Sequence, residues 1–146
     1  MSLALCFLTG CLAPVRFHPV DTTEPGWRVR QGQVLWRPKA DLPELAGDLL
    51  LAAQTNGPVF VQFSKTPLTL VEAWQTPGEW AIRFPPRDLG FSGRGQPPAR
   101  FGWLWLPAAL AGETPLAPWQ FTRQADGGWL LENPRTGESL KGFLEP

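Results

Sequence analysis

Histidine, cysteine and tyrosine are scarce or absent in this chain of 146 residues, which has one histidine, two cysteines and no tyrosine. The single histidine, His18, lies in a proline-rich N-terminal stretch that no rigid scaffold would hold, which argues against a Ser/His/Asp triad and a histidine metal site. Beyond Cys11 the chain has no thiol, which excludes a disulfide and a thiolate metal site there. We therefore expect no metal and no cofactor.

The sequence also lacks a basic patch and a long hydrophobic run. Lys and Arg together number 13, as do Asp and Glu, so the formal net charge is zero, and the charges are spread singly. Because a nucleic-acid-binding protein needs a basic footprint, no nucleic-acid partner is expected. After Leu12 no apolar run approaches the roughly twenty residues that span a bilayer, so any membrane attachment would depend on lipid alone.

Tryptophan, proline and glycine are abundant instead, with 8, 17 and 15 residues. Tryptophan supplies large apolar area, while proline and glycine supply turns and strand ends. Together they predict short, tightly joined strands in a single folded domain.

Strand patterns fill the first part of this domain, over residues 27–36, 47–54, 59–64, 68–75 and 79–84. Apolar parity switches across Gly32, which predicts a β-bulge there. Asn56-Gly57 is a hairpin turn signal. Trp80, Ile82 and Phe84 alternate with polar or small residues, which indicates a sheet with one apolar face.

The next two segments differ in character. Residues 88–96 are rich in glycine and predict a mobile loop; their likeness to a phosphate loop fails because the Gly-Lys-Ser/Thr ending is missing. Residues 97–106 favour a short apolar helix that stops at Pro107 or continues to Gly112 after a kink. The rival is another strand, because Phe101, Trp103 and Trp105 also alternate.

Closing strands are predicted over residues 119–124, 129–133 and 138–143. Consecutive short hairpins imply a mainly β fold, an antiparallel meander rather than a parallel α/β sheet. Residues 97–106 and several strands hold more apolar residues than one face of each element can bury. This excess fits either a solid core or a sheet curled into an open half-barrel round an apolar cavity, with the helix as a lid. In the second case the ligand-contacting residues would be Phe101, Trp103, Leu104, Trp105, Trp80, Ile82 and Phe84.

Paired carboxylates are the one catalytic arrangement that the composition leaves open. Asp41 with Glu44, or Glu132 with Glu138, would serve a glycosidase only if the fold set them on either side of a cleft. Solvated charges at loops and strand ends are the alternative interpretation, and we do not expect an enzyme.

The N-terminus resembles a bacterial lipoprotein signal peptide, because an apolar run over residues 3–8 leads into Leu8-Thr9-Gly10-Cys11, the pattern of a lipobox. The resemblance implies a signal peptide over residues 1–10, a lipid anchor on Cys11, a tether over 11–26 and a folded domain over 27–146. Leu12 is not aspartate, which by resemblance to known sorting rules favours the outer membrane. A buried strand or helix is the alternative for the apolar run.

The order of parts resembles the Lol-type carriers of bacterial lipoproteins, closer to the outer-membrane receptor LolB than to the soluble carrier LolA. The resemblance rests on the lipobox, the tether, the Asn56-Gly57 turn, the Pro67-Leu68 pair, the Trp-Leu-Pro helix end and the late tryptophan-rich meander. It implies a half-barrel on the periplasmic face of the outer membrane. Its partners would be lipid or lipoprotein acyl chains and a periplasmic carrier protein.

The same resemblance implies a membrane-delivery loop between two strands, with Leu68 as the exposed residue; Leu68 could equally begin a strand and face the core. Two other classes of function stay open. One is a structural or assembly lipoprotein that binds an envelope protein through its aromatic surface, and the other is a glycan-acting envelope enzyme.

Overall fold

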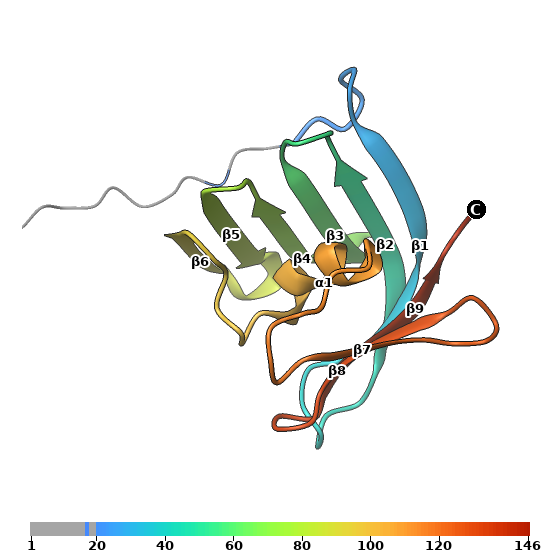
Figure 1. Ribbon diagram of the computed structural model, residues 1–146. Coiled ribbons are helices and arrows are strands. Elements are labelled where there is room, and N and C mark those ends of the chain that lie inside the picture. The colour runs from blue at the N-terminus through green and yellow to red at the C-terminus, as the bar shows by residue number, and fades with distance from the viewer. Residues whose placement is uncertain (1–16, 18–19) are drawn as a thin grey trace, which may run out of the picture.

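The computed structural model describes Phe17 and residues 20–146 (Figure 1). The predictions for residues 1–10, for the Cys11 anchor and for His18 lie outside the described residues, as does most of the tether before residue 20. None of the described helices is long and apolar enough to cross a membrane.

The described chain forms one nine-stranded antiparallel sheet in the order β6-β5-β4-β3-β2-β1-β9-β8-β7. The strands are β1 (Arg28–Arg37), β2 (Leu45–Ala53), β3 (Val59–Lys65), β4 (Leu68–Gln75), β5 (Glu79–Phe84), β6 (Leu89–Arg94), β7 (Gln120–Arg123), β8 (Trp129–Asn133) and β9 (Glu138–Leu144). Two meanders are thus joined by pairing of β1 with β9. The sheet is open, with β6 and β7 at its edges, so the prediction of a mainly β, open antiparallel meander is confirmed.

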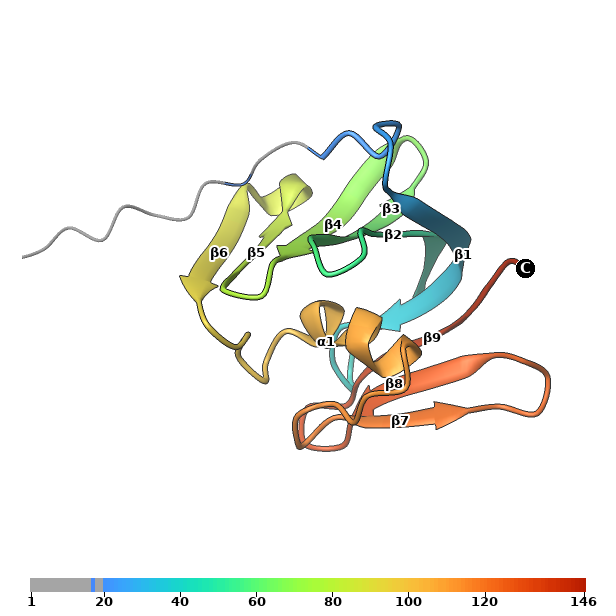
Figure 2. The same ribbon diagram turned by 45° about the horizontal axis from the view of Figure 1, so that its top comes forward.

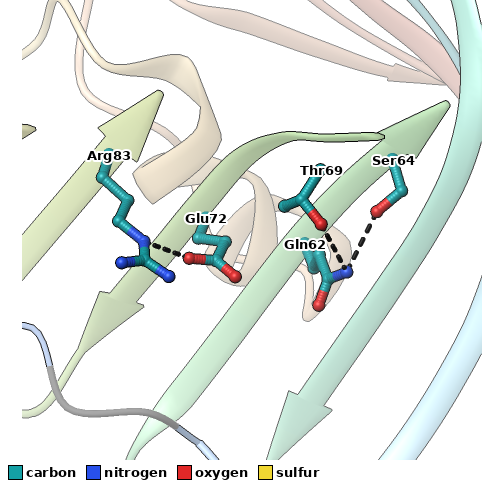
Figure 3. Close-up of polar contacts among 5 residues, drawn as sticks. All are labelled: Gln62, Ser64, Thr69, Glu72 and Arg83. Atoms are coloured by element: carbon teal, nitrogen blue, oxygen red, sulfur yellow. Dashed lines mark hydrogen bonds and ion pairs between the residues drawn. The ribbon is translucent and has the colours of Figure 1, made fainter. Parts of the chain in front are cut away.

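The curled sheet has a concave face, which holds the helix α1 (Gly102–Leu110), and a convex face on its other side (Figures 1 and 2). Figure 3 shows part of the convex face, where Gln62 donates to Ser64 at 3.0 Å and Arg83 pairs with Glu72. Large buried side chains such as Phe63, Ile82 and Trp103 belong to one core between the sheet and α1. The apolar face predicted for residues 80–84 therefore packs inward.

Residues 89–94 form the edge strand β6 and not the predicted mobile loop. Gly93 pairs with Trp80 across the sheet, and a Cβ at position 93 would lie 2.6 Å from the Trp80 ring. Glycine here makes room for a large neighbouring ring, which composition alone does not distinguish from the glycine of a loop. A short 3₁₀ turn (Pro85–Arg87) connects β5 to β6.

The predicted bulge at Gly32 is also wrong, because β1 pairs with β2 in unbroken register from Arg28 to Trp36. The parity switch has another cause: Val29 is exposed on the convex side, whereas Val34 is buried. A register shift occurs instead between β3 and β4, where Phe63 pairs with Val71 and Ser64 with Thr69. Leu70 is thus the extra residue of a bulge.

The apolar helix is present but displaced from its predicted position. It begins at Gly102, so the predicted start at residue 97 is wrong. It contains Pro107 and ends at Leu110, which agrees with the predicted continuation beyond Pro107 and not with a stop there. Gly102 faces the Trp119 ring at a distance that leaves no room for a side chain. The start of the helix therefore depends on packing against Trp119. Neither the apolar periodicity nor the proline pair at 97–98 predicts this contact.

Candidate ligand-binding pocket

A cavity of about 410 Å³ opens between the N-terminal half of α1 and one end of the concave face, and we call it the apolar pocket. Its size falls within the range of about 300–1,000 Å³ typical of small-molecule sites. The lining residues are Trp36, Pro38, Leu42, Leu45, Leu70, Ile82, Phe84, Pro86, Arg87, Leu89, Arg100, Phe101, Trp103 and Glu138. All but three of these side chains are apolar.

Packed aromatic rings form the floor of the apolar pocket. The Trp36 ring meets Trp103 edge to face at 5.6 Å between centroids and stacks on Phe84 at 6.4 Å. Trp103 in turn stacks on the buried Phe63 at 5.1 Å. Because each ring is fixed by the next, the floor is formed before any ligand enters.

Glu138 lies at one side of the pocket, at the start of β9. The indole Nε1 of Trp36 donates a hydrogen bond to its Oε1 at 3.1 Å. Burial raises the pKa of the Glu138 carboxyl from 4.5 to about 7, although the bond from Trp36 opposes this rise. Near neutral pH this carboxyl therefore exchanges between charged and neutral forms.

Arg87 and Arg100 lie at the opposite side, where the pocket meets solvent. The Arg100 guanidinium sits 4.6 Å from the Phe101 ring centroid and 4.9 Å from that of Phe91. Among the residues that the structure describes, the ion pairs are Arg37–Glu44 and Arg83–Glu72, so neither arginine at the pocket has a carboxylate partner.

Three exposed leucines lie at the same end of the sheet as the pocket. Leu42 and Leu89 line the pocket and are 43% and 40% exposed, and Leu68, beside the β3–β4 turn, is 59% exposed. Leu68 begins β4 but is exposed, so the alternative in which it begins a strand and faces the core is wrong in its second part. The pocket mouth is thus accompanied by apolar surface.

The predicted ligand-contacting residues divide into two groups. Phe101, Trp103, Ile82 and Phe84 line the apolar pocket. Trp80, Leu104 and Trp105 do not: Trp80 packs on Phe101 at 5.8 Å, Leu104 is buried in the core, and the Trp105 indole donates to the Pro98 carbonyl at 3.1 Å. The helix is therefore part of the core along much of its length, and only its N-terminal half borders the cavity.

Several pocket residues had no functional role in the sequence prediction, namely Trp36, Leu70, Arg87 and Arg100. Trp36 lies near the end of β1 on the concave side, which the strand pattern alone could have indicated. Leu70 reaches the pocket from a bulge that no sequence signal marks. The arginines enter from the β5–β6 turn and from the segment before α1.

The structure places one of the two candidate carboxylate pairs on opposite faces of the sheet. Glu132 pairs with Ser139 and Glu138 with Asn133, so these two glutamates point to opposite faces of the sheet and cannot flank one cleft. Glu44 is engaged with Arg37 at 2.8 Å, and both are exposed. Within residues 20–146 and Phe17, no cluster of three His, Cys, Asp or Glu side chains is arranged to hold a metal ion.

A second hollow of about 820 Å³ lies on the other side of α1, at the opposite end of the concave face. Its walls mix Leu51, Val59 and Leu110 with polar groups, among them Arg28 and Arg30.

No protein-family model matches the chain, and the comparison with curated proteins finds no match. What the protein binds must therefore be inferred from its cavities, and the apolar pocket is the one lined by four aromatic rings, those of Trp36, Phe84, Phe101 and Trp103.

Proposed function

We propose that this protein is a lipid-anchored protein of the bacterial outer membrane whose apolar pocket binds an acyl chain of a lipid or lipoprotein. The observation that carries the proposal is the cavity of about 410 Å³ with its aromatic floor, open at one end of the concave face. An acyl chain suits such a cavity because each buried methylene contributes about 0.8 kcal/mol to binding. The walls offer few polar groups that would recognise a sugar or a nucleotide.

The lipobox over residues 8–11 supports the anchor, and the open antiparallel sheet with an internal helix supports a Lol-like carrier. In such a carrier, Leu68 and the neighbouring end of the sheet would approach the membrane during delivery. Leu68 fits this role because, at 59%, it is the most exposed large apolar residue in the described part of the chain.

A structural or assembly lipoprotein is the second candidate, and the exposed Leu42, Leu68 and Leu89 are the observation in its favour. The aromatic side chains of α1 do not contribute to such a surface, because Trp103 and Trp105 are at most 8% exposed. A protein partner would then dock on the leucines and leave the pocket empty.

Binding of a neutral apolar dye such as Nile red to the delipidated full chain separates the two candidates. Leu70→Glu places a charge in the pocket wall at a half-buried position and should reduce binding at least tenfold. Leu35→Glu is the matched control, because Leu35 is an exposed β-strand leucine on the convex side. If the wild type binds no dye, or if both variants bind equally, the carrier proposal fails.

A further inference from the structure

We infer that the ligand of the apolar pocket carries an anionic head group, which Arg87 and Arg100 bind at the mouth. This inference rests on the proposed function, since it names the class of lipid that the pocket would take. The ligand would be a single-chain amphiphile with a carboxylate or phosphate head.

The first support is the charge inventory of the pocket wall. Among the described residues that line it, the charged or titratable ones are Arg87, Arg100 and Glu138. In the part of the chain that the structure describes, neither arginine has a hydrogen-bond acceptor or an ion-pair partner, whereas Arg37, Arg83 and Arg123 each donate to a protein oxygen. The two pocket arginines therefore keep their donors free for a ligand.

The second support is the way in which Arg100 is held. Its guanidinium lies over two aromatic rings, Phe91 and Phe101, and Phe101 itself lines the pocket. Stacking on a ring leaves the N–H groups at the edge of the guanidinium plane available, and this edge is the part that binds carboxylate or phosphate in a bidentate manner. An anion at this edge would lie next to an apolar cavity.

The third support is the separation of charge across the pocket. Arg87 and Arg100 approach from the β5–β6 side, while Glu138 belongs to β9 and accepts a hydrogen bond from Trp36 of β1. A head group beside the ionised Glu138 would be repelled, whereas one beside the arginines is attracted. The ligand would thus place its head at the arginines and extend its chain over the aromatic floor toward Trp36.

Competition against Nile red on the delipidated full chain tests this inference, with palmitate and palmityl alcohol as ligands of equal chain and different head. Palmitate should bind about five- to tenfold more tightly than the alcohol, as expected for one charge-assisted contact at a partly exposed site. Palmitoyl lysophosphatidic acid identifies the source of the charge: a preference for it over palmitate indicates a phosphate head, and the reverse indicates a carboxylate.

Arg87→Gln and Arg100→Gln should each reduce the preference for the anion over the alcohol, and Arg100→Lys, which keeps the charge but lacks the planar bidentate edge, should restore only part of it. Arg94→Gln, an exposed arginine on β6 that does not line the pocket, is the matched control and should change nothing. Equal affinity of the wild type for acid and alcohol overturns the inference and leaves the proposed function intact. Absence of Nile red binding overturns the proposed function itself.

Discussion

Replacing Glu138 with glutamine should change how the stability of this protein depends on pH. Burial raises the pKa of the Glu138 carboxyl to about 7 in the folded chain from an ordinary value of 4.5. The folded state therefore holds this proton more tightly than the unfolded state. The resulting stabilisation is complete below pH 4.5 and is lost as the pH rises through about 7.

The size of this effect follows from the two pKa values. One pKa unit corresponds to about 1.4 kcal/mol, so the group contributes at most about 3–4 kcal/mol, of which about 2–3 kcal/mol disappears between about pH 5 and pH 8. Glutamine has nearly the same shape, keeps an oxygen that accepts the Trp36 hydrogen bond and carries no charge at any pH. The free energy of unfolding of Glu138→Gln should therefore not show this decrease with rising pH.

Urea unfolding of both proteins near pH 5 and near pH 8 measures the effect. The free energy of unfolding of the wild type, taken relative to Glu138→Gln, should fall by about 2–3 kcal/mol between the two conditions. Glu132→Gln is the matched control, because it removes a carboxylate from the other face of the same hairpin. If the free energies of unfolding of the wild type and of Glu138→Gln differ by the same amount at both pH values, the reasoning is refuted.

Three further predictions concern the anchor, the edge strand and the exposed leucine. Cys11→Ser should move the protein from the membrane fraction to the soluble fraction, as fractionation with lipid analysis will show; retention of lipid would rule out this anchor. Gly93→Ala should lower the free energy of unfolding by about 1–3 kcal/mol, because its Cβ would meet the Trp80 ring at 2.6 Å, while Gly78→Ala, with open space around it, should cost far less. Leu68→Ser should change the free energy of unfolding by less than about 0.5 kcal/mol yet slow transfer of bound dye to vesicles; unchanged transfer would remove Leu68 from the delivery role.

The hairpins of this fold could be predicted from sequence because their signals are local. The turns at Asn56-Gly57 and Thr136-Gly137 lie between paired strands, and the strand over 129–133 has the predicted bounds. The predicted secondary structure is wrong where packing against a residue distant in the sequence determines the backbone conformation. Gly93 belongs to a strand because it faces Trp80, and Gly102 starts the helix because it faces Trp119.

The pocket could be predicted only in part for the same reason. The alternation of apolar residues predicts Ile82 and Phe84 as pocket residues, and the apolar segment before Pro107 predicts Phe101 and Trp103. Trp36 and Glu138 are 102 residues apart and meet because β1 pairs with β9, a pairing that no turn signal specifies. A local sequence pattern does not predict side-chain contacts that arise from pairing of strands distant in the sequence.

Photo-crosslinking with a diazirine-labelled fatty acid, followed by peptide mapping, tests most directly whether the apolar pocket holds an acyl chain. The account predicts labels on peptides that contain Leu45, Leu70 or Phe84, and competition by unlabelled palmitate should abolish them. Labels spread over convex-face residues such as Leu35 and Phe143, or labels that unlabelled palmitate does not remove, would contradict it.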